Sequence, residues 1–577
     1  MKHFLPTSKA EMQVLGWQQL DIIIISGDAY VDHPSFGPIL IARVLEAKGY
    51  KVGIISQPDW KTDADFTRLG KPRLFFGISS GNMDSMINHY TAQKKLRSSD
   101  AYSPAGKAGL RPNRATIVYS QKIRALFKDA PIVLGGIEAS LRRMPHYDFW
   151  SDKVRNSILF DSRADILVYG MGERAIIEIA AELNKGENIS ELTGIRGTVV
   201  SSSHDSGELK LPEFSDKNSP KDFLKFNKLF YENFNTKVIS YPFAGKYLIH
   251  NLPAKPLSTK ELDDVFDLPF TRLPHPSYQG KKIPAFEQIK DSITSHRGCF
   301  GGCNFCAIGA HQGKTIQSRS QNSILQEIRE LTERDYFKGT ISDVGGPTAN
   351  MYGNSCNLNI AETCKRRSCL YPEICPHLDY SAKSYKKLLK KANSTSGVNH
   401  VFISSGIRFD LALDDDDFIF QIADLHTKGL LKLAPEHKSE KVLEYMNKPA
   451  FYKYQQFVSK YSKISRELGK QQFILPYIIV GHPGATLHDT IELAVYLKKN
   501  NIKLKQVQEF TPTPMSISTL MYYTGFDLEM RKIHVPKGRE IRLMKALVQW
   551  FEPDNKKLVI EVLIDANRKE LINFFLE

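Results

Sequence analysis

Seven cysteines lie between residues 299 and 375, and the rest of the chain contains none. The first three, Cys299, Cys303 and Cys306, occur in SHRGCFGGCNFCAIG, with three and then two residues between them. Thiolates are the usual ligands of iron–sulfur clusters, and a cubane with four irons ordinarily takes four of them. Three ligands leave one iron open, and an open position distinguishes a reactive metal site from a closed structural one. The triplet therefore predicts a reactive [4Fe-4S] cluster.

A structural zinc site is the alternative for this triplet, because such sites commonly use Cys-x2-Cys pairs with a fourth Cys or His. His296 or His311 could supply that ligand. Gly298, Gly301 and Gly302 let the backbone wrap closely around a metal group. The triplet at the end of the first strand of a βα series is more specific than an isolated Cys-x2-Cys pair, so we favour the cluster.

The other four cysteines, Cys356, Cys364, Cys369 and Cys375, form a second set. Four thiols in such a short stretch can close a tetrahedral zinc site or bind an auxiliary iron–sulfur cluster, and His377 is a spare ligand. The alternative is four reduced, inert thiols of the kind that proteins commonly bury. Because cysteine is absent outside this region, we expect a second metal here without choosing its identity.

Basic residues occur within the second cysteine set and along the rest of the chain. Lys365, Arg366 and Arg367 could face an anionic substrate or solvent, and the whole chain carries a net charge of +15. Such a charge attracts polyanions, so nucleic acid is a conceivable partner. Clusters such as KSYKKLLKK at 383–391 have, however, the spacing of the solvated face of a helix. The charge therefore gives no strong indication of nucleic-acid binding.

The length of 577 residues predicts two to four domains, and 42% apolar with 24% charged residues is an ordinary globular composition. The first 20 residues lack a continuous apolar segment, and no later stretch approaches the length needed to span a bilayer. We therefore expect a cytoplasmic protein with no membrane association. In that reducing compartment the cysteines are thiols or metal ligands rather than disulfides.

The elements that must position these residues follow an α/β pattern. Over residues 1–200, short apolar runs at 22–25, 74–78, 132–134 and 166–169 alternate with helical periodicity at 39–47 and 117–127. This alternation predicts a Rossmann-like, doubly wound parallel sheet. No G-x-G-x-x-G follows the first strand, so a dinucleotide site is not expected. Residues 201–285, rich in Ser, Pro, Lys and Asp, are expected to form a connector.

A second βα series is expected over residues 286–515. Strands are predicted at 291–294, 339–344, 401–404, 430–433, 473–480 and 505–510, with helices at 323–334, 411–426, 440–446, 454–468 and 490–498. Six such units fit a partial TIM-like barrel whose active face lies at the carboxyl ends of its strands. Residues 516–577 are expected to form a small C-terminal region, with a helix at 539–551.

The triplet, with Phe305 before its last cysteine, resembles the signature of the radical S-adenosylmethionine (SAM) superfamily. The resemblance implies that the open iron chelates the amino and carboxylate groups of SAM. It also implies reductive cleavage of SAM to methionine and a 5′-deoxyadenosyl radical, which abstracts a substrate hydrogen. A flavodoxin- or ferredoxin-type electron donor is implied as a partner.

Other stretches resemble segments of that superfamily that contact SAM. Gly345, Gly346 and Pro347 resemble the Gly-Gly-Glu motif whose backbone receives the SAM amino group; Pro replaces Glu, so only the backbone role carries over. Ser405 and Arg408 occur where the third strand offers contacts to the SAM carboxylate, and Arg suits a bidentate carboxylate partner. A surface ion pair is the alternative for Arg408.

The stretch KLAPEHKSEKVLEYMNKP resembles the fourth-strand region of many members, which makes Glu436 and His437 candidates near SAM. Helix capping is the alternative for both. The stretches 477–486 and 510–516 resemble the fifth and sixth strand ends that flank adenine, although turn formation alone also explains their Gly and Pro residues.

The closest resemblance is narrower than the superfamily. GDAYVDHPSFG, SHRGCFGGCNFCAI and DVGGPTANMYG together resemble the YgiQ family of radical SAM proteins over nearly the whole chain. The N-terminal domain is similar to cobalamin-binding folds, but the Asp-x-His-x-x-Gly signature is absent. Asp32 directly precedes His33, and Gly37 lies four residues beyond it. Cobalamin bound through His33 is therefore disfavoured.

Two functional hypotheses follow. The leading one is a radical SAM enzyme that uses a [4Fe-4S] cluster and SAM on a substrate that the sequence does not indicate. The alternative is a zinc-stabilised nucleic-acid or ribosome-associated binding protein without SAM chemistry, motivated by the net charge and the thiol ligands. The sequence indicates no catalytic side chain beyond the cofactor ligands.

Overall fold

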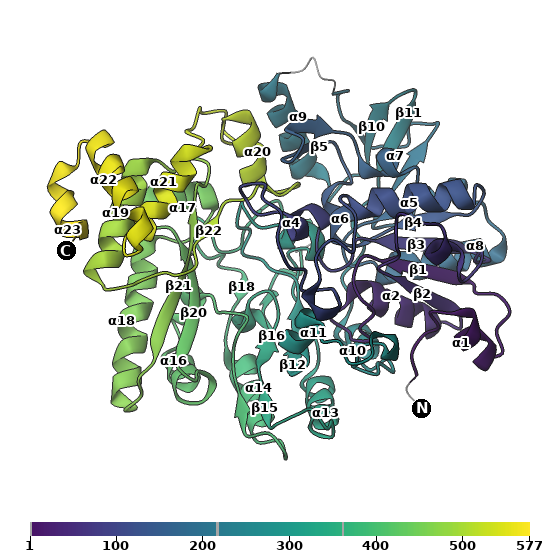
Figure 1. Ribbon diagram of the computed structural model, residues 1–577, viewed down its shortest axis with the longest axis horizontal. Helices are drawn as coiled ribbons and strands as arrows, with labels where there is room; N and C mark the ends of the chain where they lie inside the picture. Colours follow the sequence, from purple (N-terminus) through teal and green to yellow (C-terminus); the bar gives the residue numbers. More distant parts are fainter. Residues whose placement is uncertain (1–2, 215–218, 361–362, 577) are drawn as a thin grey trace.

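The computed structural model describes residues 3–214, 219–360 and 363–576. Its N-terminal part is built on a nine-stranded sheet in the order β2-β1-β3-β4-β7-β8-β11-β10-β9 (Figure 1). The first five strands in that order are parallel to their neighbours. They are β2 (Val52–Ser56), β1 (Ile22–Ser26), β3 (Phe75–Ser79), β4 (Ile132–Leu134) and β7 (Ile166–Val168). The order β2-β1-β3-β4-β7 is that of a doubly wound sheet, with a switch point between β1 and β3.

Both faces of these strands are buried, which explains their continuous apolar sequences. Along β1, Ile23 and Ile25 point into one hydrophobic cluster, whereas Ile22 and Ile24 point into another on the opposite face. The helices that follow the strands cover the two faces. They include α2 (Gly37–Glu46), α5 (Ala115–Leu126) and α8 (Glu173–Lys185), close to the helical segments predicted from periodicity.

The five parallel strands confirm the predicted doubly wound sheet, and the sheet continues beyond β7 with antiparallel strands, so that it is mixed overall. Strand β8 (Thr198–Ser202) pairs antiparallel with β7 and with β11 (Lys246–His250), and β11 pairs antiparallel with β10 (Ile239–Phe243). Strand β9 (Leu209–Lys210) completes the edge. Strands β10 and β11 form a hairpin whose two turn residues, Ala244 and Gly245, both have positive φ, as tight hairpin turns require.

The residues expected to form a connector thus contribute three strands to this sheet, together with helices α9 (Pro220–Asn233) and α10 (Thr259–Phe266). Helix α9 begins with a capping box in which Ser219 and Asp222 exchange hydrogen bonds. Residues 215–218, also part of that expectation, lie outside the described residues.

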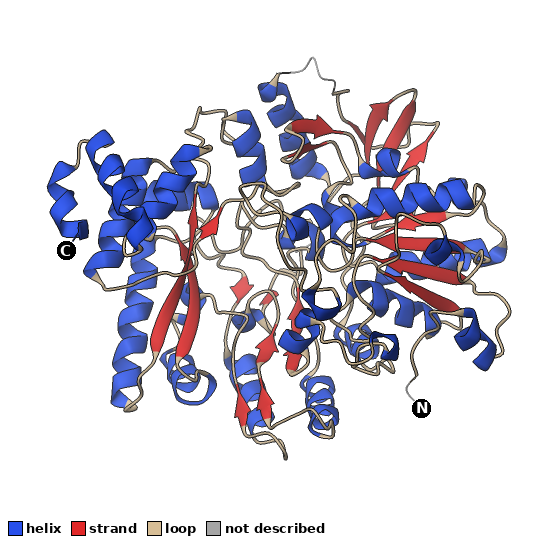
Figure 2. Ribbon diagram, viewed as in Figure 1, coloured by secondary structure: helices blue, strands red, loops and turns tan. Residues whose placement is uncertain are grey.

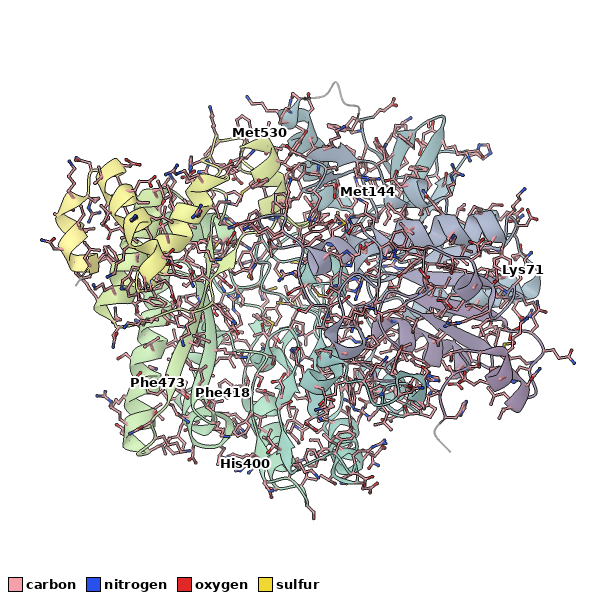
Figure 3. All side chains as sticks on the ribbon, viewed as in Figure 1. Lys71, Met144, His400, Phe418, Phe473 and Met530 are labelled. Atoms are coloured by element: carbon pink, nitrogen blue, oxygen red, sulfur yellow. The ribbon has the colours of Figure 1, made fainter. Side chains whose placement is uncertain are left out.

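The barrel part contains a strand at or overlapping each of the six predicted positions. These are β12 (Ser292–Thr294), the successive β15 (Thr340–Ile341) and β16 (Asp343–Gly345), β19 (His400–Val401), β20 (Leu430–Glu436), β21 (Phe473–Val480) and β22 (Gln508–Glu509). All recorded pairings among them are parallel. Figure 3 places His400 and Phe473, at the starts of β19 and β21, at the end of the barrel away from the N-terminal part.

The helices between these strands also match the predicted segments. They are α13 (Gln321–Thr332), α15 (Phe409–Ala412), α16 (Asp416–Gln421), α17 (Glu440–Met446), α18 (Phe451–Glu467) and α19 (Leu487–Lys499). Helix α14 (Lys383–Asn393) carries the basic cluster noted in the sequence. It buries Tyr385, Leu388, Leu389 and Ala392 and leaves most of its lysines exposed, as expected for a solvated helix face.

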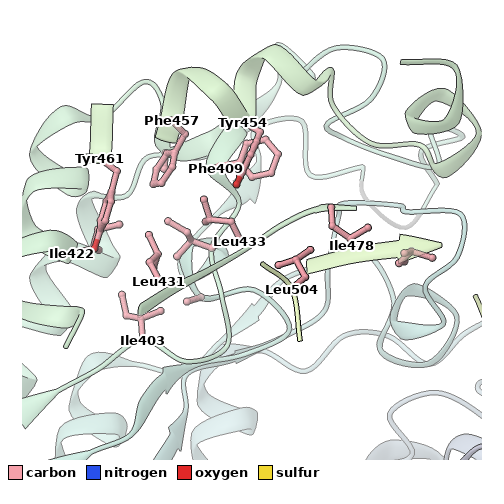
Figure 4. Close-up of a cluster of buried hydrophobic side chains, with 14 of the residues drawn as sticks. Ile403, Phe409, Ile422, Leu431, Leu433, Tyr454, Phe457, Tyr461, Ile478 and Leu504 are labelled. Atoms are coloured by element: carbon pink, nitrogen blue, oxygen red, sulfur yellow. The ribbon is translucent and has the colours of Figure 1, made fainter. Parts of the chain in front are cut away.

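The barrel wall is split between its third and fourth strands. Within the described ranges, β19 pairs only with β15, and β20 pairs only with β21. The two halves, visible as separate groups of strands in Figure 2, are joined by side chains instead. Figure 4 shows Ile403 beyond β19 close to Leu431 of β20, within a cluster that also includes Phe457 and Tyr461 of α18. Hydrophobic packing therefore closes a gap that backbone hydrogen bonds leave open.

The C-terminal region is helical. Helices α21 (Arg539–Val548), α22 (Lys556–Asp565) and α23 (Ile572–Leu576) add Met544, Val562 and Phe575 to the barrel core. Helix α20 (Ile517–Thr524) instead packs on α9 and on β5 (His146–Asp148), which forms a hairpin with β6 (Lys153–Arg155). It therefore joins the barrel to the N-terminal part. None of the helices that the structure describes is long and apolar enough to cross a membrane.

A buried ion-pair triad ties residues of the expected connector to the barrel. Glu327 on α13 accepts hydrogen bonds from Arg272 (Nη2 to Oε1, 2.6 Å) and from Arg319, and all three residues are buried. Burial alone raises the pKa of Glu327, but the two guanidinium groups outweigh it and hold this pKa below its ordinary 4.5. The carboxylate is therefore charged at neutral pH.

Replacing Glu327 by Gln should leave two buried cations without a counter-charge, at a cost of about 3–5 kcal/mol. We expect a clearly lower Tm for Glu327→Gln at pH 7, measured by calorimetry, and little change for Glu333→Gln at the exposed end of the same helix. Because the folded pKa is depressed, the wild-type advantage is present above pH 4.5 and is lost as the pH falls through the folded pKa. Equal Tm values for the two variants at pH 7 would contradict this role.

Candidate functional site

The cysteine loop begins directly after β12 and β13 (His296–Arg297), and its path depends on two glycines. Gly298 has φ +87° and Gly302 has φ +61°. A Cβ on Gly298 would lie 2.1 Å from the carbonyl oxygen of Thr315, and one on Gly302 would lie 2.5 Å from that of Arg367. Both the left-handed backbone and the close approach of neighbouring backbone therefore require glycine at these positions.

Neighbouring segments hold the loop by direct hydrogen bonds. Asn447 Nδ2 donates to the carbonyl oxygen of Gly302 (2.6 Å), and Asn304 Nδ2 donates to that of Tyr445 (2.9 Å). On the other side, Ser368 Oγ donates to the carbonyl oxygen of Gly301 (2.8 Å). The loop is therefore fixed between the fourth βα unit and the second cysteine segment.

The three thiols of the triplet share one environment. A Cβ built on Gly301 would lie 3.3 Å from Cys299 Sγ and 3.9 Å from Cys303 Sγ, so both sulfurs lie beside this glycine. Burial, and secondarily the neighbouring sulfur of Cys303, raises the pKa of Cys299 and brings that of Cys306 to about 12. A raised pKa disfavours the thiolate forms of Cys299 and Cys306. A metal group that binds thiolates would supply the missing positive charge.

Arg408, after the third strand, reaches the same thiols. Its Nη1 lies 3.7 Å from Cys303 Sγ, and its Nε and Nη2 donate to the carboxylate of Asp410 at 2.8 and 2.7 Å. Burial opposes the charged form of Arg408, but Asp410 outweighs this effect and raises its pKa. The alternative prediction for Arg408 was a surface ion pair. Arg408 does form an ion pair, but both partners are buried. Asp410 already occupies its bidentate fork.

Gly345 and Gly346 lie at the end of the second barrel strand, where their backbone is closely packed. A Cβ on Gly345 would lie 2.1 Å from Ser405 Oγ, and one on Gly346 would lie 2.6 Å from the carbonyl oxygen of His296. Ser405 donates its N–H to Asp343 Oδ1 (3.1 Å), and burial raises the pKa of Asp343. The structure therefore brings Gly345, Gly346 and Ser405 together, while their predicted contact with SAM stays a prediction.

Glu436 ends β20 with φ +68°, after a register irregularity that begins at Leu433. Its carboxylate contributes to the electrostatic environment of Cys306, and burial raises its pKa. Lys448 Nζ lies 3.8 Å from Glu436 Oε1 and donates to the carbonyl oxygen of Ala434 (2.6 Å). The irregular strand end thus directs Glu436 toward the triplet and provides it with a buried cation.

Two histidines complete the fourth and fifth strand ends. His437 Nδ1 accepts the N–H of Ser439 (3.0 Å) at the start of α17, and burial lowers its pKa to about 4. His482, after β21, lies 2.6 Å from Ser518 Oγ through its Nε2, and its ring centroid lies 6.3 Å from that of Phe305. His437 therefore has a local backbone role, whereas His482 connects the fifth strand end to the cysteine loop.

The proposed zinc ligands His296 and His311 have other partners. His296 Nδ1 lies 2.9 Å from Ser295 Oγ, and His311 Nδ1 lies 2.9 Å from Ser140 Oγ in the N-terminal part. In the described ranges of the chain, no three or more His, Cys, Asp or Glu side chains are close enough to hold one metal ion. A zinc ion gathers ligands within about 2.0–2.3 Å of one point, whereas a cubane spreads them over separate irons.

The second cysteine set packs directly against the cysteine loop. The N–H of Cys369 donates to the carbonyl oxygen of Phe300 (3.0 Å), and Cys369 and Cys375 border the same small hydrophobic cluster as Phe300. Burial raises the pKa of Cys369, and Cys375 and Cys364 add to this effect. Cys356 pairs instead with Leu378 in a two-residue ladder. Three of the four cysteines therefore lie within electrostatic range of one another.

His33 does not face either of the large cavities described below. It is buried, its Nδ1 accepts the N–H of Ser35 (3.1 Å), and its Nε2 lies 3.3 Å from Arg272 Nη1. The neighbouring Asp32 pairs with Arg43. These contacts give His33 a structural role.

Two large cavities lie where the N-terminal sheet meets the barrel. One of about 740 Å³ extends from the carboxyl ends of β1, β3, β4 and β7 to Gly345, Gly346 and Pro347. It is mostly apolar and also includes Glu173 and His296. A second cavity of about 270 Å³ lies beside Cys299, Cys303 and Cys306. Ligands of open α/β sheets usually occupy this edge of the sheet.

Sequence reasoning missed three charged residues that organise the site: Asp343, which is half-buried, and Asp410 and Lys448, which are buried. The signal for Asp410 was its position two residues after Arg408, and that for Asp343 was its position directly before the Val344–Gly345 strand end. Lys448 gave no signal, because its contact with Glu436 spans a strand, a turn and helix α17.

Family comparisons divide the chain into three matched regions. Residues 4–292 match the model for the radical SAM N-terminal domain, residues 293–497 that for the radical SAM superfamily, and residues 505–575 a domain of unknown function, DUF3362. The fold, the cysteine loop and these matches define a radical SAM protein.

Full-length relatives give the family within this class. UPF0313 proteins of Methanocella arvoryzae and Geobacter sulfurreducens are 50% and 47% identical to this chain, over 98% of it and 96% of each relative. A UPF0313 protein of Clostridium botulinum is 47% identical over 99% of the chain and 91% of its own length. The chain belongs to the UPF0313 family of the radical SAM superfamily, so the predicted YgiQ-type membership is confirmed.

Among solved structures, the chain is similar to TsrM from Kitasatospora setae, a radical SAM methyltransferase with tryptophan substrate and a SAM analog bound. The two are 16% identical with a TM-score of 0.48, over 86% of this chain and 75% of TsrM. The cobalamin-dependent SAM radical enzyme OxsB is 11% identical with a TM-score of 0.46, over 88% of this chain and 55% of OxsB.

The glycine requirement of the cysteine loop can be tested without measuring activity. Gly298→Ala should lower the iron and acid-labile sulfide content of anaerobically reconstituted protein, because its Cβ would meet the carbonyl oxygen of Thr315. Gly309→Ala is the matched control, since a Cβ there meets nothing within 4 Å. Full iron content in both variants would show that the cluster does not depend on this loop path.

Proposed function

We propose that this protein is an enzyme that binds a [4Fe-4S] cluster through Cys299, Cys303 and Cys306 and cleaves SAM reductively. The observation that carries the proposal is the approach of Arg408, from the third strand end, to this triplet: its Nη1 lies 3.7 Å from Cys303 Sγ. Glu436, from the fourth strand end, acts electrostatically on Cys306. When bound, such a cluster with an open iron supplies the electron that converts SAM to methionine and a 5′-deoxyadenosyl radical. The substrate of that radical is not identified by the fold.

The protein's own residues would adjust the charge of the cluster site. Three thiolates are strongly anionic, and the nearby cations of Arg408 and Lys448 lower the pKa of Cys299 against the effect of burial. Asp410 holds Arg408 in position through two hydrogen bonds. Because the fork of Arg408 is occupied, we assign to this residue the stabilisation of the Cys303 thiolate in addition to any contact with the SAM carboxylate.

SAM itself would lie between the cluster and the strand ends. The backbone of Gly345, Gly346 and Pro347 would receive its amino group, and Ser405 its carboxylate; the close packing at Gly345 and Gly346 supports a role for backbone rather than side chains. Glu436 would accept hydrogen bonds from SAM at the fourth strand end. His482, Phe305 and Phe510 cluster at the fifth and sixth strand ends, where an aromatic surface could hold adenine.

A flavodoxin- or ferredoxin-type donor remains the expected electron source. We also propose a second metal group at Cys364, Cys369 and Cys375, with Cys356 as the outlying ligand. The electrostatic coupling of the first three thiols supports this assignment. The absence of a preformed single-ion site among the described residues favours an auxiliary iron–sulfur cluster over zinc. The zinc-stabilised nucleic-acid protein gains no specific support from the site.

Replacing the central thiol tests the proposal directly. Anaerobically reconstituted wild-type protein with dithionite and SAM should release 5′-deoxyadenosine, and Cys303→Ala should release none while losing about four irons per chain. Ala307→Ser is a control on the same loop and should keep both properties. A wild-type protein with zinc but no acid-labile sulfide would overturn the proposal and restore the zinc hypothesis.

Glu436→Gln tests the placement of SAM separately from the cluster. Loss of the carboxylate removes a charged acceptor, so we expect the KM for SAM to rise about tenfold, equivalent to ~1.4 kcal/mol, with iron content unchanged. The measurement is 5′-deoxyadenosine formation as a function of SAM concentration. If the iron content fell instead and the KM stayed constant, Glu436 would support the cysteine loop rather than SAM.

A further inference from the structure

The smaller cavity, of about 270 Å³, is lined mainly by positively charged side chains. It lies between the N-terminal part, the cysteine loop and the segment that carries Cys364. Eight lysine and arginine side chains line it, against a single carboxylate, that of Glu232. Cys303 and Cys306 line it too, so the positive charge is concentrated directly beside the proposed cluster site.

Among the described residues, three of these cations form no ion pair with a carboxylate, although Glu529 and Glu232 act on Arg367 from a longer distance. Lys314 Nζ donates to the carbonyl oxygens of Cys364 (2.7 Å) and Arg366 (3.1 Å), which satisfies its hydrogen bonds but not its charge. Arg367 Nη1 lies 3.4 Å from the amide oxygen of Asn304. Within the described residues, no carboxylate lies within 4 Å of Lys314, Arg366 or Arg367.

Arg143 is the most informative member of this group. Its side chain is 0% exposed, yet its recorded partners are all neutral: Ser140 O (2.6 Å), His250 Nε2 (3.0 Å) and Ala310 O (3.4 Å). Its Nη2 is buried with no hydrogen-bond partner in the described structure. Burial lowers its pKa, and only tyrosines oppose this effect.

Aromatic rings hold the guanidinium group of Arg143 in place. Its Cζ lies 4.5 Å from the ring centroid of Tyr169, 5.9 Å from that of Phe230 and 5.8 Å from that of Phe234. Cation–π contacts offset part of the free-energy cost of removing the guanidinium group from water, but they do not neutralise its charge. Arginines this deeply buried are normally paired with an anion. Among the residues that the structure describes, no carboxylate pairs with this fixed cation.

We propose that this cavity binds the phosphate or carboxylate group of a small molecule beside the cluster site, with Arg143, Lys314 and Arg367 providing the positive charge. Guanidinium groups bind both anions through paired hydrogen bonds. The volume is close to the lower limit of small-molecule sites, about 300 Å³, and is too small for a protein segment. As a site for the substrate of the radical reaction it depends on the proposed function; as an anion site it does not.

The test is anion binding by the full-length, anaerobically purified protein, measured by titration calorimetry without SAM. Inorganic phosphate and malonate are titrated separately, with ionic strength held constant by sodium chloride. We expect saturable binding of at least one of them, and at least tenfold weaker binding in Lys314→Gln and Arg367→Gln. Lys387→Gln, which removes an exposed charge on α14, is the charge-matched control and should bind as the wild type does.

Arg143→Met keeps an apolar stem among the three aromatic rings and removes the charge; if it folds, it should also bind at least tenfold more weakly. The proposal is overturned if neither anion binds saturably, or if Lys387→Gln weakens binding as much as the two cavity variants. It is equally overturned if only an acidic flavodoxin-type protein binds, since the charge would then serve the docking of that donor. Anion binding in a protein that releases no 5′-deoxyadenosine would retain this inference and reject the proposed function alone.

Discussion

The close backbone packing of the cysteine loop is the constraint on which the rest of the site depends. Gly298 and Gly302 adopt left-handed conformations while neighbouring carbonyl oxygens occupy the space that a Cβ would need. This path places the sulfurs of Cys299 and Cys303 on the same side of Gly301. The loop is then fixed from outside by Asn447 and Ser368, which come from opposite sides of it. Ligand geometry is therefore a property of three chain segments rather than of the loop alone.

Charge compensation is the second theme of the molecule. Burial raises the pKa of Cys299 and Cys306, so the proposed thiolate-bound cluster would need positive charge nearby. Arg408 and Lys448, from the third and fourth βα units, lower the pKa of Cys299 against this effect. Each of these cations has a carboxylate of its own, Asp410 or Glu436, and is thereby kept in position. Arg143, on the opposite side of the loop, has no such carboxylate. Arg408 and Lys448 are therefore assigned to the proposed cluster site, whereas Arg143 is assigned to the proposed anion site.

The split barrel and the mixed sheet give the molecule its two interdomain cavities. No ladder joins β19 to β20 in the described chain, and hydrophobic packing around Ile403 and Leu431 replaces it. On the other side, the antiparallel strands β8, β11 and β10 extend the N-terminal sheet. Helix α9, from the same region, packs against α20 beyond the barrel. The larger cavity lies along the carboxyl ends of the parallel strands, and the smaller one lies beside the cysteine loop.

The sequence by itself determined the elements and the ligands. Local periodicity predicted the parallel strands and the six barrel strands, because alternation of apolar runs depends only on neighbours in the chain. The spacing of Cys299, Cys303 and Cys306 predicted the cluster, since one loop supplies all three ligands. The Ala244–Gly245 hairpin was missed although its turn signal is local, because the surrounding composition resembled a connector.

Only the tertiary structure decided how charge is arranged around these ligands. The guanidinium group of Arg408 pairs with Asp410, and Lys448 contacts Glu436. Arg143, in contrast, has a buried Nη2 without a hydrogen-bond partner in the described structure. These arrangements depend on which side chains the fold buries next to one another. Electrostatic energy depends on distance and on the surrounding dielectric. Neither can be obtained from sequence spacing once the partners lie on different elements of the fold.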